Sequence, residues 1–381
     1  MTRSISVRTH ALMLSSAAFF VFACSAGNND DGSADNLVEK SSAAHNFCGN
    51  NKCDHGETCS TCPQDCGSCG AGGSGGTTST TTTTSTTGAG GSGGGGGSGG
   101  SGGGTGVCGS TAMPPANYQH VVIFSLENRT WSNVGLGFSA TTMPYLHSLA
   151  SQCSYFSDWT ETNTGQNSLT QYIGETSGVN NTSTVNDCNP SPSCQSTDNN
   201  IFRQVRQAGG TARNYVEGAT TGCSASGNAA KHIPGLYYFG TYTDGSGTHN
   251  DHDFCNAEVH PYSEFDVNNL PTYAFITPTL CNDGHDCGDA TVDAWASTNI
   301  QRVLNSPAYA AGTTAVFVWY DEDHPVPNLH IARTSHKGNI TQTGVGTHAA
   351  LLKTIEDMLG VPFMNQGQLP GATDLRTILG L

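Results

Sequence analysis

The sequence predicts an α/β domain with a mostly parallel sheet that helices cover on both faces. Three short runs of apolar residues, 120–126, 272–277 and 314–320, are continuous enough to be strands buried on both sides. Helical patterns separate these runs along the chain. Strands that alternate with helices are typical of a parallel sheet between two helical layers. The expected fold of residues 108–381 is therefore a three-layer α/β/α arrangement.

The expected helices have recognisable ends. Helical patterns lie at 143–151, 200–208, 293–305 and 348–359. Pro144 stands early in the first, while Gly209 and Gly360 follow the second and the last, which are the positions where Pro starts and Gly ends helices. A further segment, 164–174, has the pattern of a loop that turns into a helix.

Composition and charge argue against nucleic-acid binding and against an internal membrane-spanning helix. The chain of 381 residues carries 30 Asp and Glu against 14 Lys and Arg, a formal net charge of −16. Nucleic-acid-binding proteins neutralise phosphates with basic residues, so this balance argues against nucleic acid. After the N-terminal region there is no apolar run of about 18 residues, so no internal membrane-spanning helix is expected.

The N-terminus has the features of an export signal. Arg3 and Arg8 precede a short apolar stretch that ends at Ala23-Cys24. The segment resembles a bacterial lipoprotein signal peptide, 1–23, after which Cys24 carries the lipid; cleavage without lipidation is the alternative. We expect an outer-membrane lipoprotein or an extracellular or cell-surface protein of a bacterium, which contacts a membrane only through its anchor. Residues 24–47 would form a flexible tether.

Two further segments precede the large domain. Residues 48–69 hold six Cys in 22 positions and too few apolar residues to form a core. In an exported protein this pattern predicts a small module held together by disulfides. A zinc site is the alternative reading, since two Cys-x-x-Cys pairs fall in this segment. Residues 70–107 consist almost entirely of Gly, Ser and Thr and predict a disordered linker.

Eight Cys remain for the domain at 108–381, an even number that fits complete pairing. Closeness along the chain suggests two disulfides, Cys188–Cys194 and Cys281–Cys287. The other two pairs that remain are Cys223–Cys255 and Cys108–Cys153.

Each of the three expected strands runs into acidic or His residues, at 127–130, 281–287 and 321–324. In parallel sheets, ligands bind beyond the carboxyl ends of the strands. Carboxylates gathered there would repel one another unless a divalent cation were bound. The alternative is that these loops are simply solvated. The same two readings apply to the His- and Asp-rich loop 248–255, where a solvated surface is favoured over an extra metal site.

Ser168 is the candidate nucleophile. It stands where the loop of 164–174 becomes a helix, and backbone N–H groups at a helix N-terminus suit a phosphoryl oxygen. The alternative is that Asn167 or Ser168 only caps the helix.

As a set, several motifs resemble the phosphoesterase family, which includes secreted acid phosphatases and phospholipase C enzymes on the alkaline-phosphatase-like fold. They are Glu127-Asn128-Arg129-Thr130, Ser168 with Tyr172, the Asn282-to-Cys287 stretch and Asp321-Glu322-Asp323. The matches run in order over nearly all of 118–363. The resemblance implies a metal-dependent hydrolase of phosphoric esters that uses a divalent metal ion.

The resemblance also implies roles for single residues. The implied metal ligands are Glu127, Asn128, Ser168, Asp321 and Glu322. Ser168 would be the nucleophile, with His285 and His232 as further catalytic residues. A second metal or the phosphate would be bound by Asp283, His285 and His348. The family's His two positions before the nucleophile is replaced here by Gln166, and His324-Pro325 stands where a Gly-rich turn is usual.

Three functions remain open at this point. The leading one is an acid-phosphatase-like monoesterase that forms a phosphoserine at Ser168. A phospholipase C-like phosphodiesterase is the second, so the substrate would be a phosphorylated small molecule or a phospholipid. The third is a surface-binding protein whose phosphoesterase site has decayed.

Overall fold

The computed structural model describes residues 106–110, 113–131, 139–161, 167–180, 183–184, 186–219, 222–224 and 230–381. These residues belong to one compact unit of the chain. The predicted signal peptide, Cys24, the tether, the Cys-rich module and nearly all of the linker lie outside the described residues.

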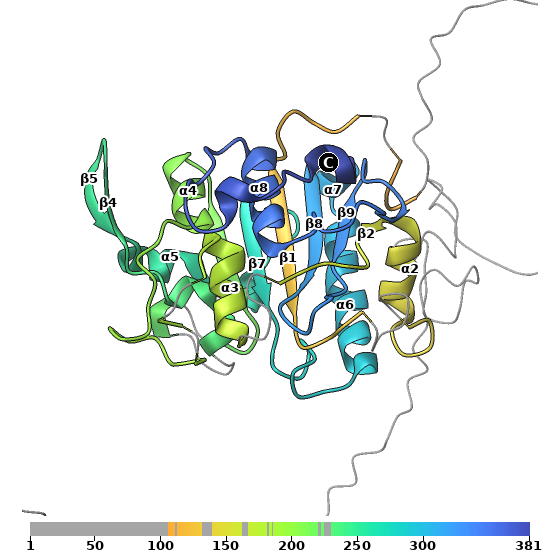
Figure 1. Cartoon of the computed structure of the whole chain (residues 1–381), viewed down its shortest axis with the longest axis horizontal. Coiled ribbons are helices and arrows are strands. Elements are labelled where there is room, and N and C mark those ends of the chain that lie inside the picture. The colour runs from red at the N-terminus through yellow and green to blue at the C-terminus, as the bar shows by residue number, and fades with distance from the viewer. Residues whose placement is uncertain are drawn as a thin grey trace, which may run out of the picture. The chain divides into compact units, whose positions relative to one another are not determined.

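An eight-stranded sheet forms the centre of the domain (Figure 1). In order across the sheet, the strands are β10 (Gly338–Asn339), β2 (Ser154–Tyr155), β9 (Leu329–Ala332), β8 (Thr314–Tyr320), β1 (His120–Leu126), β7 (Tyr273–Thr277), β3 (Ala212–Val216) and β6 (Val259–Pro261). The three strands expected from the sequence are its central β8, β1 and β7, all completely buried except for His120 at the start of β1.

Most neighbouring strands run parallel. Strand β1 pairs in parallel with β8 and β7, and β3 pairs in parallel with β7 and β6. Only β9 is antiparallel to its neighbours β8 and β2. The predicted α/β class with a mostly parallel sheet is therefore confirmed. Because β1, β7 and β8 point the same way, the residues that follow them meet at one edge of the sheet.

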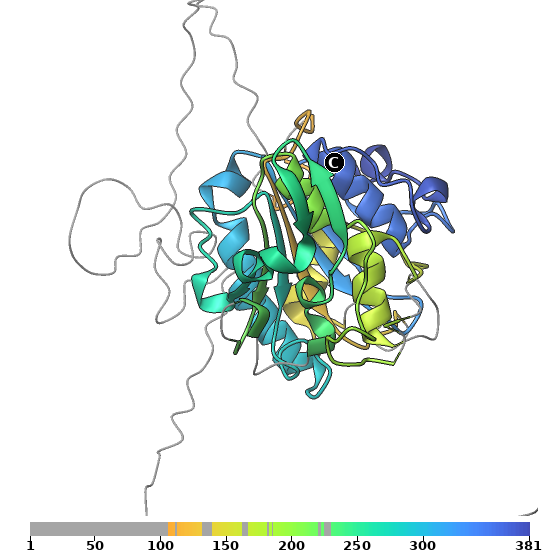
Figure 2. The same cartoon turned by 90° about the vertical axis from the view of Figure 1, so that its left-hand side faces the viewer.

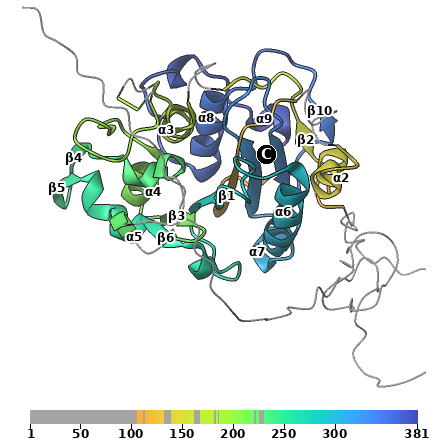
Figure 3. The ribbon, with the colours of Figure 1, turned by 90° about the horizontal axis from the view of Figure 1, so that it is seen from below.

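Helices cover both faces of the sheet. On one face α3 (Ser168–Ser177), α4 (Ile201–Gln207) and α8 (His348–Leu359) pack against one another, and on the other α6 (Asp289–Leu304) packs on α2 (Pro144–Gln152) and α7 (Pro307–Ala310). Figure 3 shows α3 and α8 on the opposite side of the sheet from α6 and α7. The predicted three layers are present. Helix α8 begins where the Thr347 side chain accepts from Ala350 N and ends at Gly360, which has a φ of 66°.

The remaining elements are short. They are α5 (Cys255–Glu258), α9 (Arg376–Leu379), the hairpin strands β4 (Thr241–Asp244) and β5 (Gly247–Asn250), and 3₁₀ turns at Gly222–Ser224, Ala230–His232, Pro234–Leu236, Asp251–Phe254, Tyr262–Glu264 and Leu369–Gly371. The hairpin lies outside the central sheet and faces the viewer in Figure 2.

The His- and Asp-rich loop 248–255 is held by structural contacts. Asp251 is buried and pairs with the guanidinium groups of Arg203 and Arg206. His252 stacks on Phe239 with ring centroids 3.9 Å apart. Cys255 is joined to Cys223 by a disulfide, so these two sulfurs, although close to His252, are not free thiolate ligands. These contacts leave no reason to assign a metal site to this loop.

All four disulfides suggested for the domain are present: Cys108–Cys153, Cys188–Cys194, Cys223–Cys255 and Cys281–Cys287. The last of them closes the loop that follows β7. Among the described residues, no helix is both long and apolar enough to cross a membrane.

Candidate active site

Glu127 and Asn128 follow β1 directly and begin the site. The Glu127 side chain is completely buried, and its Oε1 accepts a 2.5 Å hydrogen bond from the Tyr172 hydroxyl. Its backbone N–H donates to the carbonyl oxygen of Asp283 over 2.8 Å, which links the end of β1 to the loop after β7. Asn128 has a φ of 52°, a turn that most residues avoid but Asn tolerates.

Asp321 and Glu322 follow β8, the parallel neighbour of β1. Asp321 is completely buried, and its Oδ1 accepts a 3.2 Å hydrogen bond from the backbone N–H of Asn128. The Asp321 N–H in turn donates to the carbonyl oxygen of Leu126 over 3.3 Å. These hydrogen bonds join the ends of the two strands and place Glu127 and Asn128 beside Asp321 and Glu322.

Ser168 reaches this cluster from the first position of α3. Its Oγ lies 3.2 Å from Glu127 Oε2 and 3.4 Å from Glu322 Oε1, so its single proton can be donated to either carboxylate. Asn167 makes no capping hydrogen bond with its side chain. Instead Asp187 Oδ1 accepts from the N–H of Leu169 over 3.0 Å. The interpretation of Ser168 or Asn167 as a plain helix cap therefore does not describe this helix start.

His232 and Asp283 form a second group around Glu127. The His232 Nε2 lies 3.2 Å from Glu127 Oε1, and its Nδ1 lies 3.3 Å from Asp283 Oδ2. Neither contact is aligned as a hydrogen bond, although all three side chains are buried. The ring stacks on Tyr172 with centroids 5.2 Å apart. Burial lowers the pKa of His232 to about 3, so the imidazole is neutral.

The clustered carboxyl groups cannot all be ionised comfortably. Burial, followed by the charges of Asp321 and Asp283, raises the pKa of Glu127 well above its usual range. Burial also raises the pKa of Asp283 to about 7 and, together with the neighbouring Asp321, that of Glu322 to about 8. A divalent cation would offset this repulsion and allow the carboxylates to ionise.

The donor atoms fit such a cation. Two groups, Glu127–His232–Asp283 and Glu127–Asp321–Glu322, each have ligand atoms within 4.8 Å of one another. Several buried polar atoms here make no hydrogen bond to any described residue: Asn128 Oδ1, Asp283 Oδ2, Asp321 Oδ2 and both ring nitrogens of His232. Carboxylate, amide and imidazole donors together suit Zn²⁺, Mn²⁺ or Fe²⁺.

Positive charge lies beside the acidic cluster. Lys231 Nζ pairs with Asp187 Oδ2 at 3.1 Å and lies 3.4 Å from His285 Nε2. Burial acts to lower the pKa of Lys231, but the contact with Asp187 more than offsets it, so the pKa is raised and the ammonium stays charged. His285 is exposed, its ring centroid lies 5.7 Å from that of His232, and its Nδ1 contacts Asp286. Lys231 and His285 are therefore available to a substrate that enters from solvent.

His348 lies beneath the cluster instead of lining it. Its ring is completely buried, and Nε2 contacts the carbonyl oxygen of Asp321 at 2.9 Å. Its Nδ1 accepts from the indole N–H groups of Trp159 and Trp319, each at 3.0 Å. With both nitrogens engaged, His348 is not free to bind a metal or phosphate as the resemblance implied. The other implied residues converge on the site.

Two contributors had no role in the sequence interpretation. Arg129 follows Glu127-Asn128 and donates to Asp289 and to the carbonyl oxygen of Cys287; its position in the motif was the available signal. Asp187, a loop residue with a φ of 49°, accepts a hydrogen bond from the N–H of Leu169 at the start of α3. No local sequence pattern marks Asp187 as part of the site.

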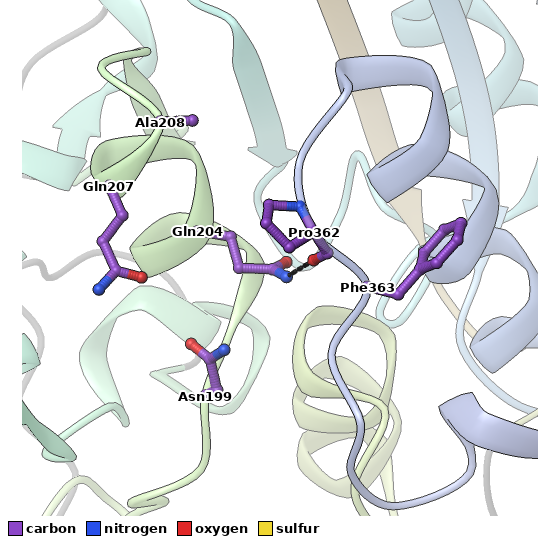
Figure 4. Close-up of a pocket in the computed structure, with 6 residues that line it drawn as sticks. All are labelled: Asn199, Gln204, Gln207, Ala208, Pro362 and Phe363. Carbon is purple, nitrogen blue, oxygen red and sulfur yellow. Dashed lines mark hydrogen bonds between the residues drawn. The ribbon is translucent and has the colours of Figure 1, made fainter.

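A cavity of about 310 Å³ lies elsewhere, between α4 and the segment after α8 (Figure 4). It is lined by Asn199, Gln204, Gln207, Ala208, Pro362 and Phe363. Helix α4 leads from this point into the start of β3, so the cavity is at the amino ends of the strands, whereas the acidic cluster is at their carboxyl ends.

Comparisons with known proteins agree with this geometry. A model of the phosphoesterase family matches residues 126–352. The chain is 27% identical over 267 residues to a phosphatidylinositol-3-phosphatase of Mycobacterium tuberculosis, covering 66% of this chain and 80% of the relative.

Two solved structures are also similar. One is an alkaline phosphatase superfamily protein of Vibrio parahaemolyticus, with 13% identity, a TM-score of 0.45 and coverage of 68% of this chain and 70% of that one. The other is a lipoteichoic acid synthase of Listeria monocytogenes, with 12% identity, a TM-score of 0.41 and coverage of 68% and 76%. The matched family segment holds every ligand and nucleophile candidate of the site, and the chain belongs to the phosphoesterase family as a phosphoric ester hydrolase.

Proposed function

We propose that the protein is a metal-dependent phosphomonoesterase in which Ser168 is transiently phosphorylated. The observation that carries this proposal is the position of the Ser168 hydroxyl, which lies within hydrogen-bonding distance of two carboxylates of the cluster. A serine in solution is a weak nucleophile, whereas one held beside bases and a cation is activated.

The proposed ligands are Glu127, Asn128, Asp321 and Glu322, together with the Ser168 oxygen. When bound there, a divalent cation would lower the pKa of the serine hydroxyl and offset the negative charge that develops on the phosphoryl group. His232 and Asp283, which share Glu127 with this set, would hold a second cation.

The chain's own residues account for the proton transfers. Ser168 Oγ gives its proton to Glu127 or Glu322 and forms a bond to phosphorus, while the bond from phosphorus to the alcohol oxygen breaks. His285 protonates the departing alcohol, because an imidazole exchanges protons near neutral pH. Water then attacks the phosphoserine, releases phosphate and restores the Ser168 hydroxyl. Lys231 pairs with unesterified phosphoryl oxygens.

Two observations favour a monoester over a diester. The relative from Mycobacterium tuberculosis is by name a phosphatidylinositol-3-phosphatase, and a phosphate on the inositol ring of such a lipid is a monoester. Lys231 supplies positive charge beside the site, next to His285, and a monoester carries one more unesterified oxygen than a diester. The substrate would be a phosphorylated small molecule or the headgroup of a phospholipid.

Export belongs to the same proposal. Four disulfides within the domain are typical of a protein that leaves the reducing cytoplasm. Anchoring through Cys24 would place the enzyme on the cell surface, where it would meet such substrates outside the cytoplasm. Labelling with a radioactive fatty acid, compared between the wild type and Cys24→Ser, tests the anchor.

Activity is tested on the full chain with p-nitrophenyl phosphate and bis-p-nitrophenyl phosphate, with and without EDTA. We expect cleavage of the monoester that EDTA abolishes and added metal restores. Ser168→Ala should lose at least about a thousandfold in kcat. Ser177→Ala, a buried serine at the other end of α3, is the matched control and should retain activity. A faster reaction with the diester would favour the phospholipase C-like enzyme, and no reaction with either would favour a decayed site.

A further inference from the structure

His348 makes three hydrogen bonds through its two ring nitrogens, and together these determine which nitrogen carries the proton. Trp159 Nε1 and Trp319 Nε1 both lie 3.0 Å from Nδ1. An indole N–H can only donate, so Nδ1 must be the accepting nitrogen. The proton of the neutral ring is then on Nε2, which donates to the carbonyl oxygen of Asp321 over 2.9 Å.

That carbonyl oxygen belongs to the peptide bond that joins Asp321 to Glu322. A peptide unit is planar and rigid, so a hydrogen bond to its oxygen restricts the backbone of both residues. On its other side, the N–H of Asp321 donates to Leu126 O at the end of β1. The Asp321 Oδ2 atom itself has no hydrogen-bond partner among the described residues. The carboxylate is therefore oriented by one hydrogen bond, from the N–H of Asn128 to Oδ1, and by the backbone that His348 contacts.

The backbone of His348 is held in place as well as its ring. His348 is the first residue of α8, and its N–H donates to the carbonyl oxygen of Thr160 over 3.3 Å. Trp159, which immediately precedes that threonine, is completely buried. Both indoles and the helix start thus hold the imidazole in one orientation, with its Nε2–H directed at Asp321.

We propose that His348 is a positioning residue that fixes the Asp321–Glu322 peptide, so that both carboxylates are held ready to bind a cation. The inference rests on the proposed function, in which these carboxylates are metal ligands. Groups of this kind, which orient a metal ligand without touching the metal, commonly contribute 10- to 100-fold to affinity.

The test compares two amide side chains of different reach in the full chain, measuring the Kd of Mn²⁺ by calorimetry. His348→Gln can place an amide N–H where Nε2–H was and should keep affinity close to that of the wild type. The shorter His348→Asn cannot reach the Asp321 carbonyl and should weaken Mn²⁺ binding by about 10- to 100-fold. Trp159→Phe removes one of the two indole donors and should weaken binding in the same direction but less.

His330 provides a matched control. It is also completely buried and packs against Trp159, and its Nδ1 contacts the carbonyl oxygen of Ser154 instead of the Asp321–Glu322 peptide. His330→Asn should lower the melting temperature without changing the Kd of Mn²⁺. If His348→Asn and His330→Asn bind Mn²⁺ equally well, the positioning role is wrong. If His348→Asn does not fold, Trp159→Phe decides instead, and an unchanged Kd in that variant would mean that the positioning role is wrong.

Asp321→Asn separates this failure from failure of the proposed function. If Asp321→Asn binds Mn²⁺ as tightly as the wild type, or the wild type binds none, the metal assignment itself is wrong. If Asp321→Asn weakens binding while His348→Asn behaves like His330→Asn, only the inference about His348 fails.

Discussion

Arg129 Nη2 donates a 3.1 Å hydrogen bond to the carbonyl oxygen of Cys287 and so joins the segment after β1 to the disulfide-closed loop after β7. The same guanidinium donates to the carbonyl oxygens of Asn128 and Gly284 and pairs with Asp289 at 2.7 Å. One side chain therefore connects two of the loops that supply ligands to the acidic cluster, the one after β1 and the one after β7.

Arg129→Lys should reduce activity although it keeps the charge. An ammonium group is a point charge and cannot satisfy acceptors on several sides at once, as the planar guanidinium does. We expect kcat/KM to fall about 10- to 100-fold, as for other residues that orient metal ligands. Arg302→Lys, whose guanidinium contacts the carbonyl oxygen of Phe265 away from the site, is the control. Equal activity of the two variants would contradict the prediction.

Removing the Cys281–Cys287 disulfide should reduce activity more, and the free energy of unfolding less, than removing the Cys108–Cys153 disulfide. The two cysteines are separated by six positions, and the loop between them carries Asp283 and His285. The chain-entropy estimate for so short a loop is about 2 kcal/mol, against about 4 kcal/mol for Cys108–Cys153, whose separation is 45 residues. Double Cys→Ser variants of each pair are compared by urea unfolding and by activity per folded molecule. A larger activity loss from the Cys108–Cys153 variant would oppose this ranking.

Lys231→Gln should discriminate between substrate classes. The ammonium group pairs with Asp187 and lies next to His285, where an unesterified phosphoryl oxygen would be bound. We expect KM for the monoester to rise about tenfold, roughly the 1.4 kcal/mol of one charge-assisted contact, with a smaller change for the diester. Lys353→Gln, on α8 and bonded to Ala372 O, should change neither KM. Equal losses on both substrates would remove Lys231 as a specificity determinant.

Glu356 should make stability depend on pH. Burial raises the pKa of Glu356 from its ordinary 4.5 to about 7, and its Oε1 accepts from Gln204 Nε2 and from the backbone N–H of Met364. A group whose folded pKa is raised binds more protons in the native state. Its stabilising contribution is complete below about pH 4.5 and is lost as the pH rises through 7.

Glu356→Gln keeps the accepting oxygen but cannot ionise. The decrease in unfolding free energy between pH 5 and pH 8, measured with urea, should therefore be smaller in this variant than in the wild type. Asp357→Asn changes the neighbouring, partly exposed carboxyl and should leave that decrease as it was. A wild-type slope retained in Glu356→Gln would mean that other groups cause it.

The centre of the fold and the main members of the site follow from local patterns. Strands β1, β7 and β8 can be predicted from the sequence because burial on both faces requires continuous apolar runs. The acidic residues after them meet because parallel strands end at one edge. The edge strand β10 and its neighbour β2 have only two residues each, too few to form a pattern.

The sequence alone determined that the acidic residues after the central strands would gather at one end of the sheet, since period and polarity are properties of short stretches. Only the tertiary structure decided which candidate side chains face the site and which are engaged in other contacts. His348 has the residue type of a ligand, yet its partners Trp159 and Trp319 lie 189 and 29 residues away and occupy its Nδ1. Which atom an imidazole presents, and to what, depends on how α8 packs against the sheet, and no local pattern records that packing.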